Sequence, residues 1–174
     1  MTSFERIDSS TAWEGKLATV RVERFRYDDG EEAEREIVVH PGAVAVIARD
    51  GDRILLVRQP REAVGESALL ELPAGKLDQG EDPLTTAKRE LAEEIGKGAR
   101  TWEYLTSVWT SPGFIQEEVH LYEATDLYDQ AAESDEEERI EIETVPIARL
   151  DDLIRECRDA KSLVGLLWYR AFRL

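Results

Sequence analysis

Residues 75–96 have the sequence GKLDQGEDPLTTAKRELAEEIG, and this stretch decides the fold. Its apolar residues recur at the spacing of one helix face, at Leu84, Ala87, Leu91 and Ile95. Pro83 is tolerated in a first helical turn, and Gly96 is a typical C-terminal stop. The stretch therefore predicts a loop followed by a helix from Asp82 to Ile95.

Segments with the chemistry of strands lie on both sides of this helix. The nearly continuous apolar runs at 42–49 and 53–59 flank Asp50-Gly51-Asp52 and predict central strands covered on both faces. Further strands are expected at 69–73, 102–110, 118–125 and 140–147, and amphipathic helices at 147–160 and 162–172. Strands before and after one central helix, with helices at the end, predict an α/β protein built as a mixed sandwich.

The N-terminal region has a strand pattern of its own. Residues 16–39 alternate apolar and polar on either side of Asp28-Asp29-Gly30, which predicts two antiparallel strands joined by a turn. The chain has 174 residues, slightly more than the roughly 150 of one ordinary domain. We therefore expect a small N-terminal antiparallel β region over residues 1–41 and the main domain over 42–174.

Composition limits the classes of partner. The 22 Lys and Arg residues against 38 Asp and Glu give a net charge of −16, which opposes binding to nucleic acid or an anionic membrane. Cys157 is the only cysteine, so an intrachain disulfide is impossible and a reducing compartment is expected. The sequence shows neither a signal-peptide pattern nor an apolar run of about 18 residues. These features predict a cytoplasmic protein without nucleic-acid or membrane partners.

Three glutamates fall on one face of the predicted helix. Glu90, Glu93 and Glu94 stand at positions i, i+3 and i+4, a spacing that brings side chains together. One interpretation is a solvated acidic face, which an acidic protein acquires by chance. The other is a Mg²⁺ site, because Mg²⁺ takes oxygen ligands and is held by one or two carboxylates plus substrate phosphates. The helix alone leaves both interpretations open.

The residues around these glutamates resemble the Nudix box, the signature of hydrolases that cleave nucleoside diphosphates linked to another moiety. The matching positions are Gly75, Glu81, Arg89, Glu90, Leu91, Glu93, Glu94 and Gly96. One departure is Lys97, where the family usually has an apolar residue, and it concerns packing beyond the helix. The resemblance implies an α/β/α sandwich with a mixed sheet, in agreement with the strand and helix pattern.

The resemblance also implies a metal site. Glu90 and Glu94 would be the principal Mg²⁺ ligands, Glu93 a further ligand, and the backbone carbonyl of Ala74 would complete the site. Two or three ions, Mg²⁺ or else Mn²⁺ or Zn²⁺, suit this number of carboxylates. Around them, Gly75 would let the loop backbone approach the metal, Glu81 would tie the loop to the helix, and Arg89 would orient the glutamates.

A second resemblance concerns the substrate. Pro112 stands sixteen residues after Gly96, a placement similar to the ADP-ribose pyrophosphatase branch of the family, although Pro112-Gly113 alone is typical of an ordinary turn. The branch hydrolyses ADP-ribose to AMP and ribose 5-phosphate. Membership would imply a homodimer that the N-terminal hairpins hold together. It would also make Glu117 the general base, with Glu118 as the alternative one position on.

Other residues are candidates for substrate contacts. Arg61 is the best candidate for a phosphate contact, because a guanidinium donates paired hydrogen bonds. Arg58 is a second candidate, with an unliganded surface arginine as the alternative. Glu36 resembles a position that contacts the adenosine part across a dimer interface. Trp13, Phe25 and Tyr27 are candidates for stacking on adenine or for core and interface packing.

The remaining polar residues have simpler interpretations. His40, just before Pro41, indicates the end of a strand, and His120 indicates a structural histidine within one. The acidic stretch Asp135–Glu138 is interpreted as solvated surface, with an auxiliary metal or water contact as the alternative.

Two alternative functions stay open at this point. The substrate can be another nucleoside diphosphate sugar or a dinucleotide, such as GDP-mannose or diadenosine polyphosphate. The chain can also be a non-catalytic Nudix module that senses ADP-ribose. Such a module is expected to lose box glutamates or to bind DNA, whereas here Glu90, Glu93 and Glu94 are all present and the net charge opposes DNA.

Overall fold

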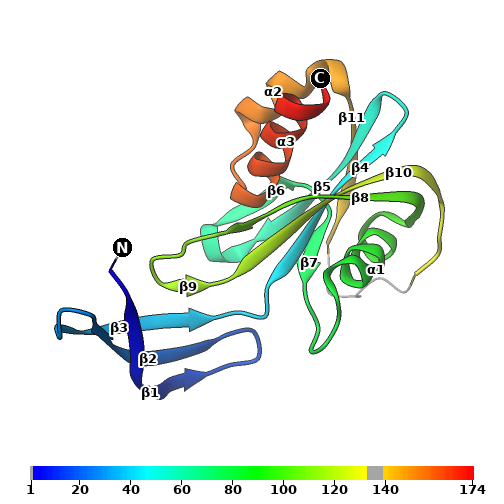
Figure 1. Ribbon diagram of the computed structural model, residues 1–174. Helices are drawn as coiled ribbons and strands as arrows, with labels where there is room; N and C mark the ends of the chain where they lie inside the picture. Colours follow the sequence, from blue (N-terminus) through cyan, green and yellow to red (C-terminus); the bar gives the residue numbers. More distant parts are fainter. Residues whose placement is uncertain (1, 133–138) are drawn as a thin grey trace. The chain divides into compact units, whose positions relative to one another are not determined.

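The computed structural model describes residues 2–132 and 139–174 (Figure 1). The contacts divide these residues into two compact units. The N-terminal unit contains the chain up to Gly42 together with Trp109–Glu118. The larger unit contains Ala43–Val108 and the chain from Val119 onward. The segment Trp109–Glu118, which follows the predicted helix by more than a dozen residues, therefore belongs to the N-terminal unit.

The N-terminal unit is a four-stranded sheet with the order β1-β2-β3-β9. Its strands are β1 (Phe4–Glu14), β2 (Thr19–Tyr27), β3 (Glu32–Val39) and β9 (Ile115–Gln116). The expected hairpin is confirmed, because β2 and β3 pair antiparallel around Gly30, whose φ of 87° suits glycine. Strand β1 was not predicted: it pairs antiparallel with β2 but is exposed along nearly its whole length, so it has no apolar alternation.

The larger unit contains a seven-stranded mixed sheet. Along the order β11-β5-β4-β10-β8, strand β4 pairs parallel with β10 and antiparallel with β5, while β6 adds to β5 and β7 adds to β4. The strands are β4 (Ala43–Asp50), β5 (Arg53–Arg61), β6 (Glu66–Glu71), β7 (Ala74–Lys76), β8 (Lys97–Trp109), β10 (Glu118–Asp129) and β11 (Glu141–Pro146). The runs at 42–49 and 53–59 are therefore confirmed as central strands.

Helices cover both faces of this sheet (Figure 1). The helices are α1 (Pro83–Ile95), α2 (Leu150–Glu156) and α3 (Ala160–Arg173), with short 3₁₀ turns at Glu62–Val64 and Ile147–Arg149. Along β4, Ala45 and Ile47 pack in the cluster with α2 and α3, whereas Val44 and Val46 pack in the cluster with α1. Because alternate residues of one strand face opposite layers, the predicted α/β/α sandwich is confirmed.

The C-terminal helices differ slightly from the predicted segments. Helix α2 ends at Glu156 because Cys157 adopts an extended conformation, and Asp159 then caps α3 by accepting a hydrogen bond from the Ser162 N–H. Cys157 is a buried free thiol. In the part of the chain that the structure describes, helices of the length and apolar character needed to cross a membrane are absent.

Candidate active site

Helix α1 is fixed at both ends, and this sets the face on which its glutamates lie. Asp82 caps the N-terminus by accepting hydrogen bonds from the N–H groups of Leu84, at 3.1 Å, and Thr85, at 3.2 Å. Asp82 also accepts a hydrogen bond from the Thr85 hydroxyl. That bond is the main cause of the lowered pKa of Asp82, and the two N–H bonds add to it. Gly96 ends the helix at φ 66° and donates its N–H to the Ala92 carbonyl at 3.0 Å. The expected helix is confirmed to within one residue.

Glu94 connects the helix to the strand that precedes it. Its Oε2 accepts a hydrogen bond from the Ala74 N–H at 2.9 Å, and its Oε1 lies 3.4 Å from Nε2 of Gln59. Glu94, Ala74 and Gln59 are all buried, which makes these contacts strong determinants of geometry. The carboxylate of Glu94 is therefore held against strand β7.

Glu90 lies against the next residue of the same strand. A Cβ atom at Gly75 would come within 1.9 Å of Glu90 Oε1 and 2.0 Å of its carboxyl carbon. Only glycine leaves room for the carboxylate at this position. The carboxylates of Glu90 and Glu94 thus both border the Ala74–Gly75 backbone.

Arg89 lies among the other acidic groups. Its Nη1 donates to Glu90 Oε1 at 2.8 Å and to Glu93 Oε2 at 2.9 Å, while Nη2 donates to Glu81 Oε2 at 3.2 Å and to the Lys76 carbonyl at 3.3 Å. Burial works against the charge of Arg89, but its bonds to these carboxylates outweigh that effect and raise its pKa. The guanidinium thus contacts Glu90 and Glu93, two of the glutamates that it was expected to orient.

Glu81 anchors the loop before the helix. It accepts hydrogen bonds from Arg89 and, at 2.8 Å, from the hydroxyl of Thr86, which is fully buried. The Arg89 bond is the main cause of the lowered pKa of Glu81. Glu81 therefore links the loop to the first turns of α1.

The donor set fits a hard divalent cation. The carboxylates of Glu90, Glu93 and Glu94 and the carbonyl of Ala74 supply only oxygen, which Mg²⁺ prefers. Among the described residues, no group of three or more His, Cys, Asp or Glu side chains lies close enough together to hold a metal ion by itself. Mg²⁺ commonly uses one or two carboxylates, several waters and substrate phosphates, so such a convergence is not required. A cation here would share Glu90 and Glu93 with Arg89.

Arg61 forms a bidentate salt bridge with a buried carboxylate. Its Nε and Nη2 donate to the two carboxylate oxygens of Glu71 at 2.6 Å and 3.0 Å. Glu71 is 1% exposed and also pairs with Lys161. The Glu71 bond is the main cause of the raised pKa of Arg61. The Arg61 side chain is 41% exposed. Because Nε and Nη2 already bind Glu71, Nη1 is the nitrogen through which Arg61 would contact a phosphate.

Arg58 links three elements of the larger unit. Its Nε donates to Glu143 on β11 at 2.6 Å, and its Nη2 donates to Glu156 on α2 at 2.5 Å. The Glu156 bond is the first cause of its raised pKa. Two of its nitrogens are therefore used to join β5, β11 and α2.

Glu117 lies in the N-terminal unit, between β9 and β10. The Thr110 hydroxyl donates to Glu117 Oε2 at 2.8 Å, and His40 Nδ1 lies 3.2 Å from Oε1. The contact with His40 was not predicted. His40 and Glu117 are far apart in the sequence, so spacing gives no signal for it. Glu36 lies on β3, opposite Val22, and is exposed.

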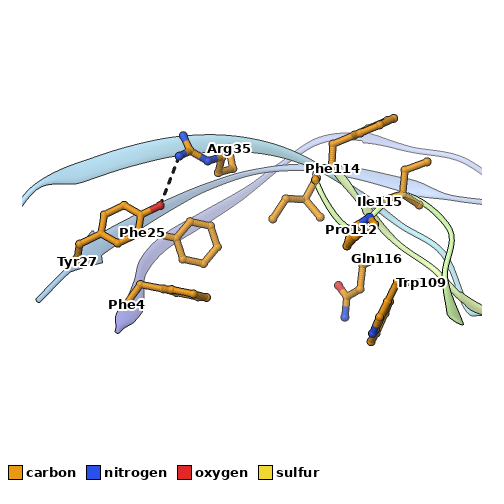
Figure 2. Close-up of a pocket in the computed structure, with 11 residues that line it drawn as sticks. Phe4, Phe25, Tyr27, Arg35, Trp109, Pro112, Phe114, Ile115 and Gln116 are labelled. Carbon is orange, nitrogen blue, oxygen red and sulfur yellow. Dashed lines mark hydrogen bonds between the residues drawn. The ribbon is translucent and has the colours of Figure 1, made fainter. Parts of the chain in front are cut away.

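Aromatic side chains line a pocket of about 420 Å³ in the N-terminal unit (Figure 2). They include Phe4, Phe25, Tyr27, Trp109 and Phe114, beside Pro112. Phe4 and Phe25 meet edge to face with centroids 5.6 Å apart, and Arg35 donates to the Tyr27 hydroxyl at 3.4 Å. Trp13, a stacking candidate together with Phe25 and Tyr27, does not line this pocket. The Asp135–Glu138 stretch lies outside the described residues.

Comparisons with known proteins identify the family of the chain and several relatives. The family model of the NUDIX domain matches residues 38–164. An ADP-ribose pyrophosphatase of Bacillus subtilis (strain 168) is 41% identical over 173 residues, which cover 95% of this chain and 93% of that protein. A methanol dehydrogenase activator of Bacillus methanolicus is 39% identical over 165 residues, covering 92% and 89%. A crystal structure of an ADP compounds hydrolase matches with a TM-score of 0.86 and 26% identity, over 97% and 93% of the two chains.

Proposed function

The chain belongs to the Nudix family, and we propose that it hydrolyses the diphosphate bond of ADP-ribose to AMP and ribose 5-phosphate. The observation that carries this proposal is the placement of Glu90 and Glu94 against the Ala74–Gly75 backbone. The B. subtilis relative is named an ADP-ribose pyrophosphatase and is similar over almost the whole chain.

The proposed cofactor is Mg²⁺, with Mn²⁺ or Zn²⁺ as substitutes. Glu90 and Glu94 would be the principal ligands, joined by Glu93 and the Ala74 carbonyl, in a site for two or three ions. When bound, such ions neutralise diphosphate charge and make water a better nucleophile. Arg89 supports this assignment because it holds Glu90 and Glu93 in place through hydrogen bonds of 2.8 and 2.9 Å.

The proposed chemistry is a displacement at phosphorus. Glu117 accepts a proton from water, the water oxygen forms a bond to one phosphorus, and the bond from that phosphorus to the bridging oxygen breaks. The bridging oxygen leaves with the other phosphate. Attack at either phosphorus gives the same two products, so product identity alone does not assign the step.

Substrate contacts are proposed for three side chains. Arg61 would bind a phosphate oxygen through Nη1, with Arg58 in a secondary role and Glu36 contacting the adenosine part. The net charge of −16 makes such local contacts necessary, because an anionic substrate otherwise meets a negative protein. We therefore expect weak binding of ADP-ribose when divalent cations are removed.

We also propose a cytoplasmic homodimer assembled through the N-terminal unit. Phe4, Trp109 and Phe114 are more than half exposed and lie together at the pocket of Figure 2. Clustered exposed aromatic residues are typical of interaction surfaces. The oligomeric state is measured by sedimentation velocity, and a monomer at micromolar concentration would contradict this proposal.

A substrate panel tests the proposed activity. ADP-ribose, GDP-mannose, diadenosine polyphosphate and NADH are each incubated with the protein in Mg²⁺ or in EDTA, and the products are separated by chromatography. We expect ADP-ribose to give the highest kcat/KM and EDTA to abolish turnover. Faster hydrolysis of another substrate would move the specificity to that compound. Saturable binding of ADP-ribose without turnover of any substrate would instead support a sensing module.

A further inference from the structure

We propose that Ser162, on helix α3, is a positioning residue for the proposed metal site: it fixes the backbone of Glu71–Ala74 and thereby directs the Ala74 carbonyl. The inference rests on the proposed function, because it takes the Ala74 carbonyl as a metal ligand. Ser162 lies 90 residues after Leu72 in the sequence, outside the Nudix box. The contacts that carry the inference all lie within the larger unit.

The segment Glu71–Ala74 links two strands and is buried throughout. Strand β6 ends at Glu71 and β7 begins at Ala74, so Leu72 and Pro73 belong to neither strand. Pro73 has no backbone N–H, which leaves Leu72 with the only amide hydrogen of this link. That amide donates to a side chain, Ser162 Oγ, at 2.7 Å. Ser162 therefore takes the place that a neighbouring strand would otherwise have.

The hydroxyl of Ser162 is held in the orientation that accepts this bond. Its hydrogen is donated to Asp159 Oδ2 at 2.5 Å, which leaves an oxygen lone pair for the Leu72 N–H. Asp159 is the N-cap of α3 and also accepts from the Ser162 N–H at 3.0 Å. Because the acceptor carboxylate is charged, its bonds are stronger than those between neutral groups. The cap of α3 thus sets the direction of the serine hydroxyl.

Gly165 shows how closely α3 approaches the link. A Cβ atom at Gly165 would lie 2.7 Å from Leu72 Cδ1 and 3.3 Å from Leu121 Cδ2. Ser162 and Gly165 are three residues apart and therefore lie on one face of the helix. Leu72 and Ser162 are both fully buried, so water does not compete for the bond between them. The backbone and the side chain of Leu72 are therefore both held against α3.

The link leads directly into the proposed metal ligand. The Pro73 carbonyl accepts the Val46 N–H of β4 at 2.8 Å, whereas the Ala74 N–H turns away from β4 and donates to Glu94 at 2.9 Å. Ala74 is opposite Ala45 in this antiparallel pair. In such a pair the N–H and C=O of one residue point to the same side, so the Ala74 carbonyl also faces away from β4. It lies on the side of the Glu94 carboxylate, its proposed partner in binding the metal.

Ser162 and Glu94 therefore fix the same stretch of backbone from two helices. Ser162 holds Leu72 from α3, and Glu94 holds Ala74 from α1. Without the Ser162 hydroxyl, the buried Leu72 amide has no acceptor and the stretch is fixed from one helix only. The Ala74 carbonyl then loses its set direction. Loss of such a partner outside the ligand shell typically costs about 10–100-fold in metal affinity or activity.

Metal binding in the absence of substrate tests this role. Mn²⁺ is the probe, because unbound Mn²⁺ is counted by electron paramagnetic resonance, and the binding that disappears in Glu94→Gln defines the site. We expect Ser162→Ala to raise the Kd of this site about tenfold, and Ser162→Thr, which keeps the hydroxyl, to restore most of the loss. Ser162→Cys fills the same space with a weaker acceptor and should fall between them, so it carries the test if Ser162→Ala does not fold.

Leu166→Ala is the matched control. It removes a fully buried side chain from the same helix but leaves the Leu72 N–H with its partner Ser162. The Kd for Mn²⁺ should therefore stay unchanged in Leu166→Ala. An equal rise in Ser162→Ala and Leu166→Ala would overturn the inference, because general loosening of α3 would then explain it. An unchanged Kd in Ser162→Ala, with binding lost in Glu94→Gln, would contradict the role of Ser162 and leave the metal site intact. Equal binding by wild type and Glu94→Gln would instead overturn the metal site and the inference with it.

Hydrogen exchange in the metal-free protein follows the backbone directly. The Ala74 amide is bonded to Glu94, so its exchange rate reports whether the end of the link stays in place. We expect Ser162→Ala to speed the exchange of Ala74 relative to the amides of α1, whereas Leu166→Ala should change both alike. If Ala74 and α1 kept the same relative rates in Ser162→Ala, Ser162 would not hold this backbone.

Discussion

The Cα atom of Gly75 is so close to the carboxylate of Glu90 that a methyl group at this position would lie 1.9 Å from Glu90 Oε1. Gly75 pairs with Val44 on the central strand β4, and this pairing keeps the backbone of β7 from moving away from the helix. The helix cannot retreat either, because Glu94 is bonded to the neighbouring Ala74 N–H at 2.9 Å. The glycine is therefore required for the shape of the carboxylate site.

Substitution Gly75→Ala tests this relationship. We expect the Glu90 carboxylate to be displaced and the Mg²⁺ concentration for half-maximal activity to rise by about tenfold or more. The free energy of unfolding should change little, because the new methyl group meets only the end of the flexible Glu90 side chain. Activity is titrated with Mg²⁺, and unfolding is followed in urea. An unchanged Mg²⁺ requirement would mean that Glu90 is not a ligand.

Substitution Glu94→Gln tests the metal site while preserving the fold. The amide oxygen of glutamine can still accept the Ala74 N–H, and its NH2 group can donate to the Gln59 amide oxygen once the Gln59 amide turns over, so we expect only a small change in thermal stability. Mutations outside the ligand shell of metal sites typically cost about 10–100-fold, so loss of a charged ligand should lower kcat by at least about 100-fold. Turnover of ADP-ribose in excess Mg²⁺ measures the effect. Activity within twofold of wild type would remove Glu94 from the ligand set.

Local patterns predicted helix α1 and most strands of the larger sheet, but they missed β7 (Ala74–Lys76). Strand β6 begins and ends a few residues before the expected 69–73, and β8 begins five residues before the expected 102–110. The apolar period from Leu84 to Ile95 and the Gly96 stop depend on neighbours within one or two turns, and such signals are visible in sequence. The cluster of box residues was also predictable, because Arg89 and its acidic partners lie on one loop and helix. Resemblance to the Nudix box supplied the expected roles, which helical spacing alone left open.

Contacts between distant segments could not be predicted in the same way. Strand β1 is held by backbone pairing with β2, which needs no apolar pattern. Arg58 was a candidate for substrate binding, but its ion pairs with Glu143 and Glu156 join elements far apart in the chain. The contact between His40 and Glu117 has the same character. Sheet pairing brings Arg58 near Glu143 and His40 near Glu117, whereas Glu156 reaches Arg58 from helix α2.

Substitution Arg89→Met is expected to destabilise the protein in a pH-dependent way. The bond from Arg89 is the main cause of the lowered pKa of Glu81. A carboxyl group with a lowered pKa in the folded state stabilises the protein above its unfolded pKa, and this contribution is lost as the pH falls through the folded value. The difference in unfolding free energy between wild type and Arg89→Met should be roughly 1–2 kcal/mol at pH 7 and should shrink below about pH 4.

A matched variant provides the control for that measurement. Arg155 forms a 3.0 Å ion pair with Asp152, but these side chains are 73% and 59% exposed. Exposed ion pairs contribute little, so Arg155→Met should change stability by less than about 0.5 kcal/mol at either pH. Urea unfolding at pH 7 and pH 3.5 compares the two variants. A constant difference between wild type and Arg89→Met across this range would contradict the linkage to Glu81.

Substitution Arg61→Met separates a substrate contact from a structural ion pair. Glu71 is buried and pairs with both Arg61 and Lys161, so removing either cation should cost on the order of 2 kcal/mol of stability. Of these two cations, only Arg61 is proposed to bind phosphate. We therefore expect Arg61→Met to raise KM for ADP-ribose about tenfold, the equivalent of one charge-assisted hydrogen bond.

Lys161→Met is the control because it disturbs the same carboxylate from a less exposed position. The Lys161 side chain is 17% exposed against 41% for Arg61, and Lys161 also pairs with Asp159 at 2.9 Å. It should lose stability comparable to that of Arg61→Met while keeping KM within twofold of wild type. If both variants raised KM equally, the effect would come from displacement of Glu71, and Arg61 would not be a phosphate ligand. A rise in KM confined to Arg61→Met would assign the contact to its guanidinium.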